Sequence, residues 1–242
     1  MSVNEMVDAQ ASIEISKAPD IDASTVIGYK SLYNRLVKRV IDFVLASVIT
    51  VCVSPILAIA SIAIFIEDGM PILYRAERGG LHAKPFKICK FRSMVKNADK
   101  NGGGTTALRD KRITRTGNIL RKTKIDEFPN LYNILVGQMS FVGPRPELLR
   151  YTNQYKGVEK LILEVRPGIT DYSSIEFINL DEIVGSGNAD EIYEQKVLPK
   201  KNRLRIKYAA DVSLRTDIKI FFMTVYKVIE KAFGFLFKGK HR

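Results

Sequence analysis

The 242-residue chain is poor in the residues that build disulfide scaffolds and metal centres. Its two cysteines, Cys52 and Cys89, lie far apart, which excludes a disulfide framework and a four-cysteine zinc site. Its two histidines, His82 and His241, are too few for a histidine-rich metal site and argue against Ser-His-Asp chemistry. Any catalysis must therefore use carboxylates, lysine, arginine, tyrosine or hydroxyl groups.

Acidic residues are scarce relative to basic ones. The chain holds 38 Lys and Arg against 26 Asp and Glu, a net charge of +12, and 46% of it is hydrophobic. Residues 1–28 carry −4 and no aromatic side chain, so the other residues carry +16. This composition predicts a disordered tail over 1–28, followed by a basic body with a hydrophobic core. The surplus indicates an anionic partner: nucleic acid, anionic lipid or a phosphorylated substrate.

One long segment has no charge at all. Residues 43–66 form a run of 24 uncharged and mostly apolar residues. As a straight helix the run would be about 36 Å long, enough to cross a hydrocarbon core of roughly 30 Å. A signal peptide is a poor alternative, because the charged region ahead of the run is far too long. The run therefore predicts insertion into a membrane.

The middle and the flanks of this run bear on its topology. Pro55 lacks a backbone donor and clashes with the preceding turn, and Ser54 can bond back to that turn, so both predict a break in the helix. Basic residues lie on both sides of the run, which suits a helix that re-enters on one face, while a kinked spanning helix stays open. Lys38 and Asp42 stand four residues apart and could pair near the headgroups.

The body after residue 67 shows mixed patterns that predict an α+β fold. Residues 71–74 and 86–91 look like short strands, and the glycines at 79 and 80 predict a turn between them. The Gly-rich stretch 101–104 lacks a strand before it and a helix after it, so a loop is favoured over a phosphate cradle. Residues 214–236 have helical apolar spacing, which favours an interfacial helix; a helix packed on the core is the alternative.

A densely basic stretch leads directly into an acidic pair. Seven Lys and Arg residues lie within 109–124, and Asp126 and Glu127 follow them. No aromatic residue interrupts these cations, which disfavours nucleic-acid binding. The two acids could simply be exposed near the start of a helix over 130–136. Alternatively, the phosphate-suited cations around them favour a metal ligand or a nucleophile toward phosphorus.

A second candidate for anion binding is a short proline-rich loop. Pro144 and Pro146 restrict the backbone on either side of Arg145. A guanidinium on such a stiff loop loses little entropy on binding and is suited to bidentate contact with phosphate. Arg145 is therefore a candidate phosphate-binding residue.

Several ordered motifs together point to a known family. They are 38–42 (KRVID), 54–55 (SP), 90–94 (KFRSM), 113–117 (ITRTG), 120–129 (LRKTKIDEFP), 139–146 (MSFVGPRP) and 166–170 (RPGIT). Through them the chain, from about Tyr33 to Val228, resembles the bacterial sugar-transferase family, the small monotopic polyprenyl-phosphate phosphoglycosyl transferases. After Thr170 the chain departs from the commoner family pattern, so the resemblance does not specify the sugar.

The resemblance implies a particular organisation and activity. It implies a tail (1–28), a re-entrant membrane helix-break-helix (29–67) and a helix-rich catalytic domain with a small β-hairpin (68–242), on the cytoplasmic face of the bacterial inner membrane. It further implies Mg²⁺-dependent transfer of a sugar-1-phosphate from a UDP-sugar to polyprenyl (undecaprenyl) phosphate. An aspartyl phosphosugar would form, UMP would leave, and membrane-linked glycan assembly would begin. The oligomeric state is left open.

The resemblance also implies roles for individual residues. Asp126 matches the family nucleophile and metal-binding acid, and Glu127 matches its partner. Arg121 and Arg145 match phosphate or nucleotide contacts, and Lys90 and Arg92 lie in another family motif as candidate substrate-binding residues. Two rival hypotheses are a non-catalytic adaptor that binds anionic lipid or a partner at the membrane, and a membrane-tethered nucleic-acid binder.

Overall fold

The computed structural model describes residues 27–98, 105–107, 110–185 and 188–238. Nearly all of the predicted tail, and the predicted loop over 101–104, lie outside these residues. The described part combines many helices with an antiparallel pair of strands, β1 and β2, and a parallel pair, β3 and β4. The prediction of a helix-rich α+β fold with a small β-hairpin is confirmed at this level.

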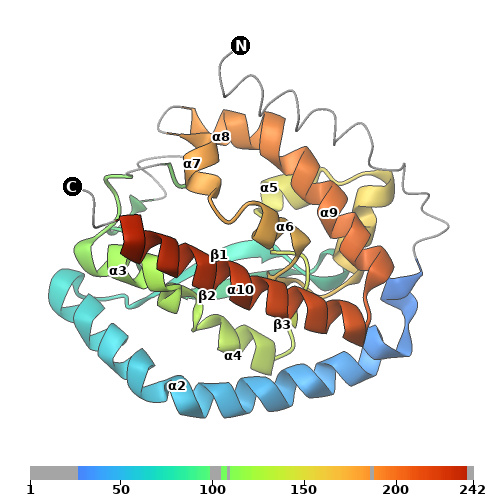
Figure 1. The fold of residues 1–242 in the computed structure, drawn as a ribbon, viewed down its shortest axis with the longest axis horizontal. Coiled ribbons are helices and arrows are strands. Elements are labelled where there is room, and N and C mark those ends of the chain that lie inside the picture. Colours follow the sequence, from blue (N-terminus) through green and yellow to red (C-terminus); the bar gives the residue numbers. More distant parts are fainter. Residues whose placement is uncertain (1–26, 99–104, 108–109, 186–187, 239–242) are drawn as a thin grey trace.

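The elements follow one another along the chain as in Figure 1. The strands are β1 (Leu73–Gly79), β2 (Pro85–Phe91), β3 (Ser140–Val142) and β4 (Gly168–Thr170). The α-helices are α2 (Lys38–Asp68), α3 (Arg115–Thr123), α4 (Asn130–Leu135), α5 (Leu149–Thr152), α6 (Tyr172–Glu176), α7 (Leu180–Val184), α8 (Ala189–Ile192), α9 (Leu198–Asp211) and α10 (Leu214–Lys238). Short 3-10 and π turns cover Gly28–Lys30, Tyr33–Val37, Leu81–Ala83, Ile125–Glu127, Gly157–Glu164 and Tyr193–Val197.

The predicted apolar run lies within α2, the helix that is long and apolar enough to cross a membrane among the described residues. The structure corrects the predicted break at Ser54 and Pro55, because helical structure continues through both residues. Pro55 cannot donate to the Val51 carbonyl, but the Ser54 hydroxyl donates to it at 2.8 Å. The freed carbonyl is thus satisfied, and α2 bends in its middle without ending (Figure 1).

The N-terminal end of α2 is held to the body by buried polar contacts. The Lys38 ammonium forms its ion pair with Asp217 of α10, while its charge also acts on Asp42, the partner suggested by the sequence. Asp42 accepts a hydrogen bond from the Phe141 backbone N–H at 3.2 Å. The Lys38 and Asp42 side chains are both buried, and these contacts offset part of the cost of removing their charges from water.

The C-terminal end of α2 is held to the same body. The Glu67 carboxylate accepts hydrogen bonds from the first two backbone N–H groups of α3, those of Arg115 at 2.9 Å and Thr116 at 2.8 Å. A negative charge is favourable at this helix terminus. Between its two ends, α2 buries Ala46, Ala60 and Ile64 against the body. The helix therefore lies along the body rather than projecting from it (Figure 1).

The hairpin of β1 and β2 packs against α4, and α4 in turn packs against α2 (Figure 1). Strand pairing runs from Leu73–Phe91 to Gly79–Pro85. The predicted strand 86–91 matches β2 closely, whereas the prediction for the first strand, 71–74, overlaps β1 only at its start. The buried Asn133 side chain covers the outer edge of β2: it accepts from the Cys89 N–H at 2.9 Å and donates to the Lys87 carbonyl at 2.8 Å. One apolar cluster joins these elements: Ala46, Phe86, Ile88, Leu131, Ile134 and Met139.

The parallel pair of β3 and β4 was not predicted. It brings the loop after β3, which carries Arg145, beside β4. A side chain at Gly168 would place its Cβ 2.2 Å from the Gly143 backbone nitrogen, so only glycine permits this approach. The pair packs against the buried residues Tyr208 of α9 and Ile220 of α10.

The predicted helix over 214–236 is present as α10, which lies across the face of the body seen in Figure 1. Its inner side buries Asp217 and Ile220. A stripe of apolar side chains on its other side is exposed to solvent: Leu214, Ile218, Phe221, Phe222, Val225 and Ile229. The helix therefore both packs on the core and presents an apolar surface.

Candidate active site

Asp126 and Glu127 lie at a sharp turn between α3 and α4. Lys124 adopts the left-handed conformation, with φ of 60°, and closes α3 through a backbone hydrogen bond to Arg121. The 3-10 turn Ile125–Glu127 follows at once and leads into α4. The alternative of two exposed acids is wrong, because Asp126 is 7% exposed and the Glu127 side chain is 12% exposed.

Glu127 is a fully paired carboxylate. The Arg145 guanidinium contacts both of its oxygens, with Nη1 3.0 Å from Oε2, and the Lys90 ammonium lies 3.2 Å from Oε1. Burial alone would raise the pKa of Glu127, but the Arg145 and Lys90 cations hold it well below its usual range. Glu127 is therefore ionised and fixes the two cations in place.

Asp126 differs from its neighbour in having a free oxygen. Its Oδ1 is buried and makes no hydrogen bond to the described part of the chain. Burial, and then the adjacent Glu127 charge, raise the pKa of Asp126, while Lys90, Arg121 and Lys124 act in the opposite direction. A carboxylate that lies near cations but keeps an oxygen without a hydrogen bond is suited to attack phosphorus or to bind a metal ion.

Arg145 is held from two sides. Its Nη1 donates to the Ile169 carbonyl of β4 at 3.0 Å, in addition to its contacts with Glu127. Its backbone N–H donates to Asp171 Oδ2 at 3.3 Å. The Arg145 side chain as a whole is still 30% exposed. This geometry agrees with a phosphate-binding role for Arg145.

The other predicted residues fall into two groups. Lys90 and Arg121 lie close enough to Asp126 to influence its ionisation. Arg92, in contrast, is placed at the end of α2: it forms an ion pair with Asp68 at 2.9 Å and donates to the carbonyls of Asp68 and Gly69. The structure therefore does not bring Arg92 to the acidic pair. Ser54 and Pro55 lie in the middle of α2.

The residues present can be compared with the requirements of Mg²⁺. Among the described residues, no group of three or more His, Cys, Asp or Glu side chains could enclose a metal ion. Mg²⁺ is commonly bound by one or two carboxylates together with substrate phosphates. The free, buried Oδ1 of Asp126 fits that mode, whereas both Glu127 oxygens are occupied by cations.

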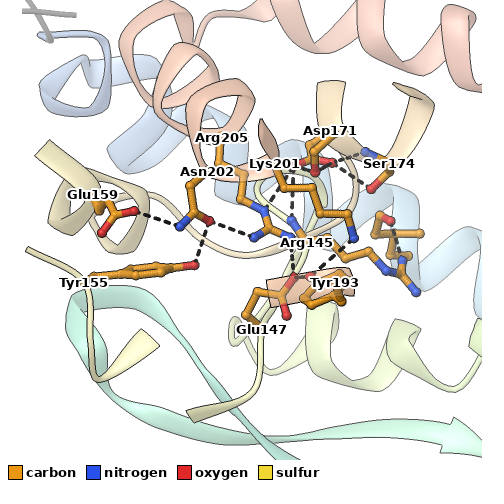
Figure 2. A network of polar contacts seen from close by, with 12 residues as sticks. Arg145, Glu147, Tyr155, Glu159, Asp171, Ser174, Tyr193, Lys201, Asn202 and Arg205 are labelled. Atoms are coloured by element: carbon orange, nitrogen blue, oxygen red, sulfur yellow. Dashed lines mark hydrogen bonds and ion pairs between the residues drawn. The ribbon is translucent and has the colours of Figure 1, made fainter. Parts of the chain in front are cut away.

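Sequence reasoning missed the residues that support Arg145 from behind. Asp171 caps α6 and accepts hydrogen bonds from Ser173 and Ser174, and Glu147 pairs with the buried Arg205 of α9 (Figure 2). The Asp-x-Ser-Ser pattern at 171–174 was a usable signal for the cap. No sequence signal connects Arg205 to a loop 60 positions earlier.

Comparison with known proteins agrees with the class of enzyme that this site indicates. The model of the bacterial sugar transferase family matches residues 33–231, and the chain belongs to this family. It is 37% identical over 198 residues to UDP-glucose:undecaprenyl-phosphate glucose-1-phosphate transferase of Escherichia coli, a match covering 80% of this chain and 40% of that protein. It is 35% identical over 195 residues to the uncharacterized sugar transferase EpsL of Bacillus subtilis, covering 80% and 88%.

Proposed function

We propose that the protein transfers a sugar-1-phosphate from a UDP-sugar to undecaprenyl phosphate and releases UMP. The observation that carries the proposal is the buried Asp126, with one unbonded oxygen, beside a Glu127 that holds Lys90 and Arg145. The names of relatives support both substrates, including a putative undecaprenyl-phosphate N-acetylgalactosaminyl 1-phosphate transferase of Bacillus subtilis that is 36% identical over 152 residues. The match to the Escherichia coli relative covers 40% of the length of that protein.

The first step is a displacement at the phosphorus that bears the sugar. A carboxylate oxygen of Asp126 bonds to this phosphorus, and the bond to the bridging oxygen breaks. UMP leaves with that oxygen and the bonding electrons, and an aspartyl phosphosugar remains. Arg145 offsets the negative charge of the pyrophosphate, which would otherwise repel the incoming carboxylate.

The second step returns the carboxylate. A phosphate oxygen of undecaprenyl phosphate bonds to the same phosphorus, and the bond to Asp126 breaks. The product is undecaprenyl diphosphate-linked sugar, the start of a membrane-linked glycan. Because UMP leaves before the lipid reacts, the two displacements give ping-pong kinetics.

Mg²⁺ fits as a cofactor held by Asp126 together with the diphosphate of the nucleotide sugar. When bound, the ion neutralises phosphate charge and makes the phosphorus more susceptible to attack. Lys90 and Arg121 add positive charge near Asp126 and keep the carboxylate more readily ionised.

The membrane arrangement we propose is a re-entrant α2 on the cytoplasmic face of the inner membrane. Both ends of α2 are bound to one body, through Lys38 at the start and Glu67 at the end. If α2 crossed the bilayer, its two ends would lie on opposite sides of about 30 Å of hydrocarbon. The body, which contacts both ends, could not then stay on one side of the membrane. The exposed apolar stripe of α10 is suited to lie in the interface. The active site would then lie near the lipid phosphates.

Replacement of Asp126 by Asn tests the mechanism. We expect UMP release from a UDP-sugar with undecaprenyl phosphate to fall roughly a thousandfold, about 4 kcal/mol in activation free energy, because the nucleophile is lost. Without acceptor, the unchanged protein should release about one UMP per molecule and gain the mass of a phosphosugar, and the variant should do neither.

The matched control is Asp181→Asn, which removes an exposed carboxylate from α7 and should leave turnover unchanged. Burial raises the pKa of Asp126 in the folded protein above its value in the unfolded chain. Above that folded-state pKa, the buried carboxylate lowers the free energy of unfolding. The unfolding temperature of Asp126→Asn should therefore be unchanged or higher. Full activity in Asp126→Asn would overturn the mechanism, and lipid binding without any UMP release in the unchanged protein would favour an adaptor.

A further inference from the structure

A buried polar network lies behind the candidate active site (Figure 2). Its centre is Arg205 of α9, a fully buried arginine. Figure 2 labels nine further residues of the network: Arg145, Glu147, Tyr155, Glu159, Asp171, Ser174, Tyr193, Lys201 and Asn202. Of these, Arg145 is the one that is hydrogen-bonded to Glu127 in the described part of the chain, so the rest of the network meets the candidate active site through Arg145.

Arg205 lies between two acids that flank Arg145. Its Nη2 donates to Glu147 Oε1 at 2.6 Å, and its Nε is 3.9 Å from Asp171 Oδ2. Glu147 follows Arg145 by two residues, and Asp171 accepts the backbone N–H of Arg145. The Arg205 guanidinium is thus hydrogen-bonded to Glu147 in the Arg145 loop. It also lies near Asp171, which accepts the backbone N–H of Arg145.

The loop depends on such external contacts. Pro144 and Pro146 restrict local backbone torsions, but they do not determine how the loop as a whole sits on the protein. That placement comes from the Glu147 side chain, from the Glu147 carbonyl, which accepts the Gly79 N–H at 3.1 Å, and from Asp171. The guanidinium of Arg145 extends in the other direction, to Glu127 and the Ile169 carbonyl.

The chemistry of this network is more than stability requires. Buried ion pairs can often be replaced by well-packed apolar residues at no loss of stability, because desolvation of the charges is costly. What apolar packing cannot supply is directional contact at chosen atoms. Here the directional contact ends on Glu147, two residues after Arg145. Asp171, 3.9 Å from Arg205 Nε, is close enough for attraction between charges but is not hydrogen-bonded to it.

We propose that Arg205 and Glu147 are positioning residues that hold Arg145 where it meets the diphosphate of the nucleotide sugar. The proposal rests on the proposed function and deepens it, since it assigns α9 to the placement of a phosphate-binding side chain. A displacement of about 1 Å at a reacting group can cost roughly a hundredfold in rate, so small changes behind the loop affect turnover.

A double-mutant cycle between Arg205 and Arg145 tests the proposal. Arg205→Lys keeps the buried positive charge, but an ammonium lacks the planar fork with which the guanidinium donates to Glu147 and Asn202 at once. Turnover of UMP release, at saturating UDP-sugar and undecaprenyl phosphate, is measured for the unchanged protein, Arg205→Lys, Arg145→Ala and the double variant. Glu147→Gln is measured in the same way as a second variant, in case Arg205→Lys does not fold.

If Arg205 acts through Arg145, Arg205→Lys should lower turnover about tenfold or more in the unchanged background and less than about threefold in the Arg145→Ala background. An equal loss in both backgrounds, or no loss in a folded Arg205→Lys protein, would overturn the proposal. Glu159→Gln is the matched control: Glu159 accepts from Asn202 at 2.9 Å, at the far end of the network, and its replacement should not change turnover. Absence of UMP release from the unchanged protein would instead overturn the proposed function.

Discussion

At the scale of single residues, two neighbouring carboxylates have opposite properties. The pKa of Glu127 is held low by Arg145 and Lys90, while burial and the charge of Glu127 raise the pKa of Asp126. Environments that separate the pKa values of adjacent acids commonly assign them different roles. In the proposed mechanism, Glu127 holds the cations in place and Asp126 supplies the reactive oxygen.

The acid side of the pH profile should report this division. The nucleophile must be ionised, so kcat/KM should rise with pH through the pKa of Asp126, which lies above the usual aspartate value. Glu127→Gln removes the adjacent negative charge and should move this limb to lower pH. Lys90→Met removes a cation that favours ionisation and should move it to higher pH. The measurement is kcat/KM for UMP release between about pH 4 and 8.

The opposite signs of the two shifts make this experiment discriminating. Both variants are expected to lose activity at neutral pH, because both change the candidate site. Shifts in the same direction would contradict the assignment of the limb to Asp126. Asp181→Asn, on the exposed surface of α7, should leave the limb in place.

At the scale of elements, the sequence predicted those with strong local signals. The apolar run predicted α2, and the apolar spacing of 214–236 predicted α10. The pair of β3 and β4 was missed because each strand has three residues, too few for a periodic pattern. The hydrogen bond of Ser54 to the preceding turn was anticipated, but the predicted break was wrong, because α2 stays helical through Pro55.

The same limit applies to the site. Motifs identified Asp126, Glu127 and Arg145 as candidates, but not which of the two acids the arginine contacts. Arg92 was grouped with Lys90 among the substrate-binding residues because both lie in one family motif, 90–94. The structure shows the two facing different partners, Glu127 and Asp68. Pairings across long sequence separations depend on the tertiary fold and leave no local signal.

The re-entrant arrangement of α2 predicts the accessibility of its flanks. In a protein whose native Cys52 and Cys89 are replaced by serine, single cysteines are placed at the exposed positions Lys30 and Lys84. A membrane-impermeant thiol reagent applied to intact spheroplasts should label neither, and both should be labelled after permeabilisation. Labelling of one position alone in intact spheroplasts would show that α2 spans the bilayer.

At the scale of the whole molecule, one carboxylate joins α2 to the body. Asp217 of α10 accepts hydrogen bonds from Tyr33 at 2.6 Å and Tyr208 at 2.7 Å and forms an ion pair with Lys38. The start of α2 and the α9–α10 region, far apart in sequence, meet there, beside the β3 carbonyl of Val142 to which Tyr208 also donates. The position of α2 is thus linked to the layer that carries the Arg145 loop.

Replacement of Asp217 should destabilise the whole protein. Asp217→Asn leaves Lys38, which is 3% exposed, without its carboxylate partner. Breaking a buried pair in this way costs about 3 to 5 kcal/mol. We expect a clearly lower unfolding temperature in detergent or nanodiscs. Glu230→Gln, which removes an exposed ion pair with Lys227 on the same helix, should not change it; equal stability of both variants would contradict the role of Asp217.

The contacts along the edges of the β1–β2 hairpin bear on whether copies of the protein would associate at a membrane surface, where we propose that it lies. A protein confined to two dimensions meets copies of itself often, and an open strand edge invites pairing between chains. The Asn133 amide occupies the edge of β2, and the bridge between Arg78 and Leu148 covers part of β1. These contacts leave fewer free backbone groups at the two edges of the hairpin, which lowers its tendency to pair with a strand of another copy.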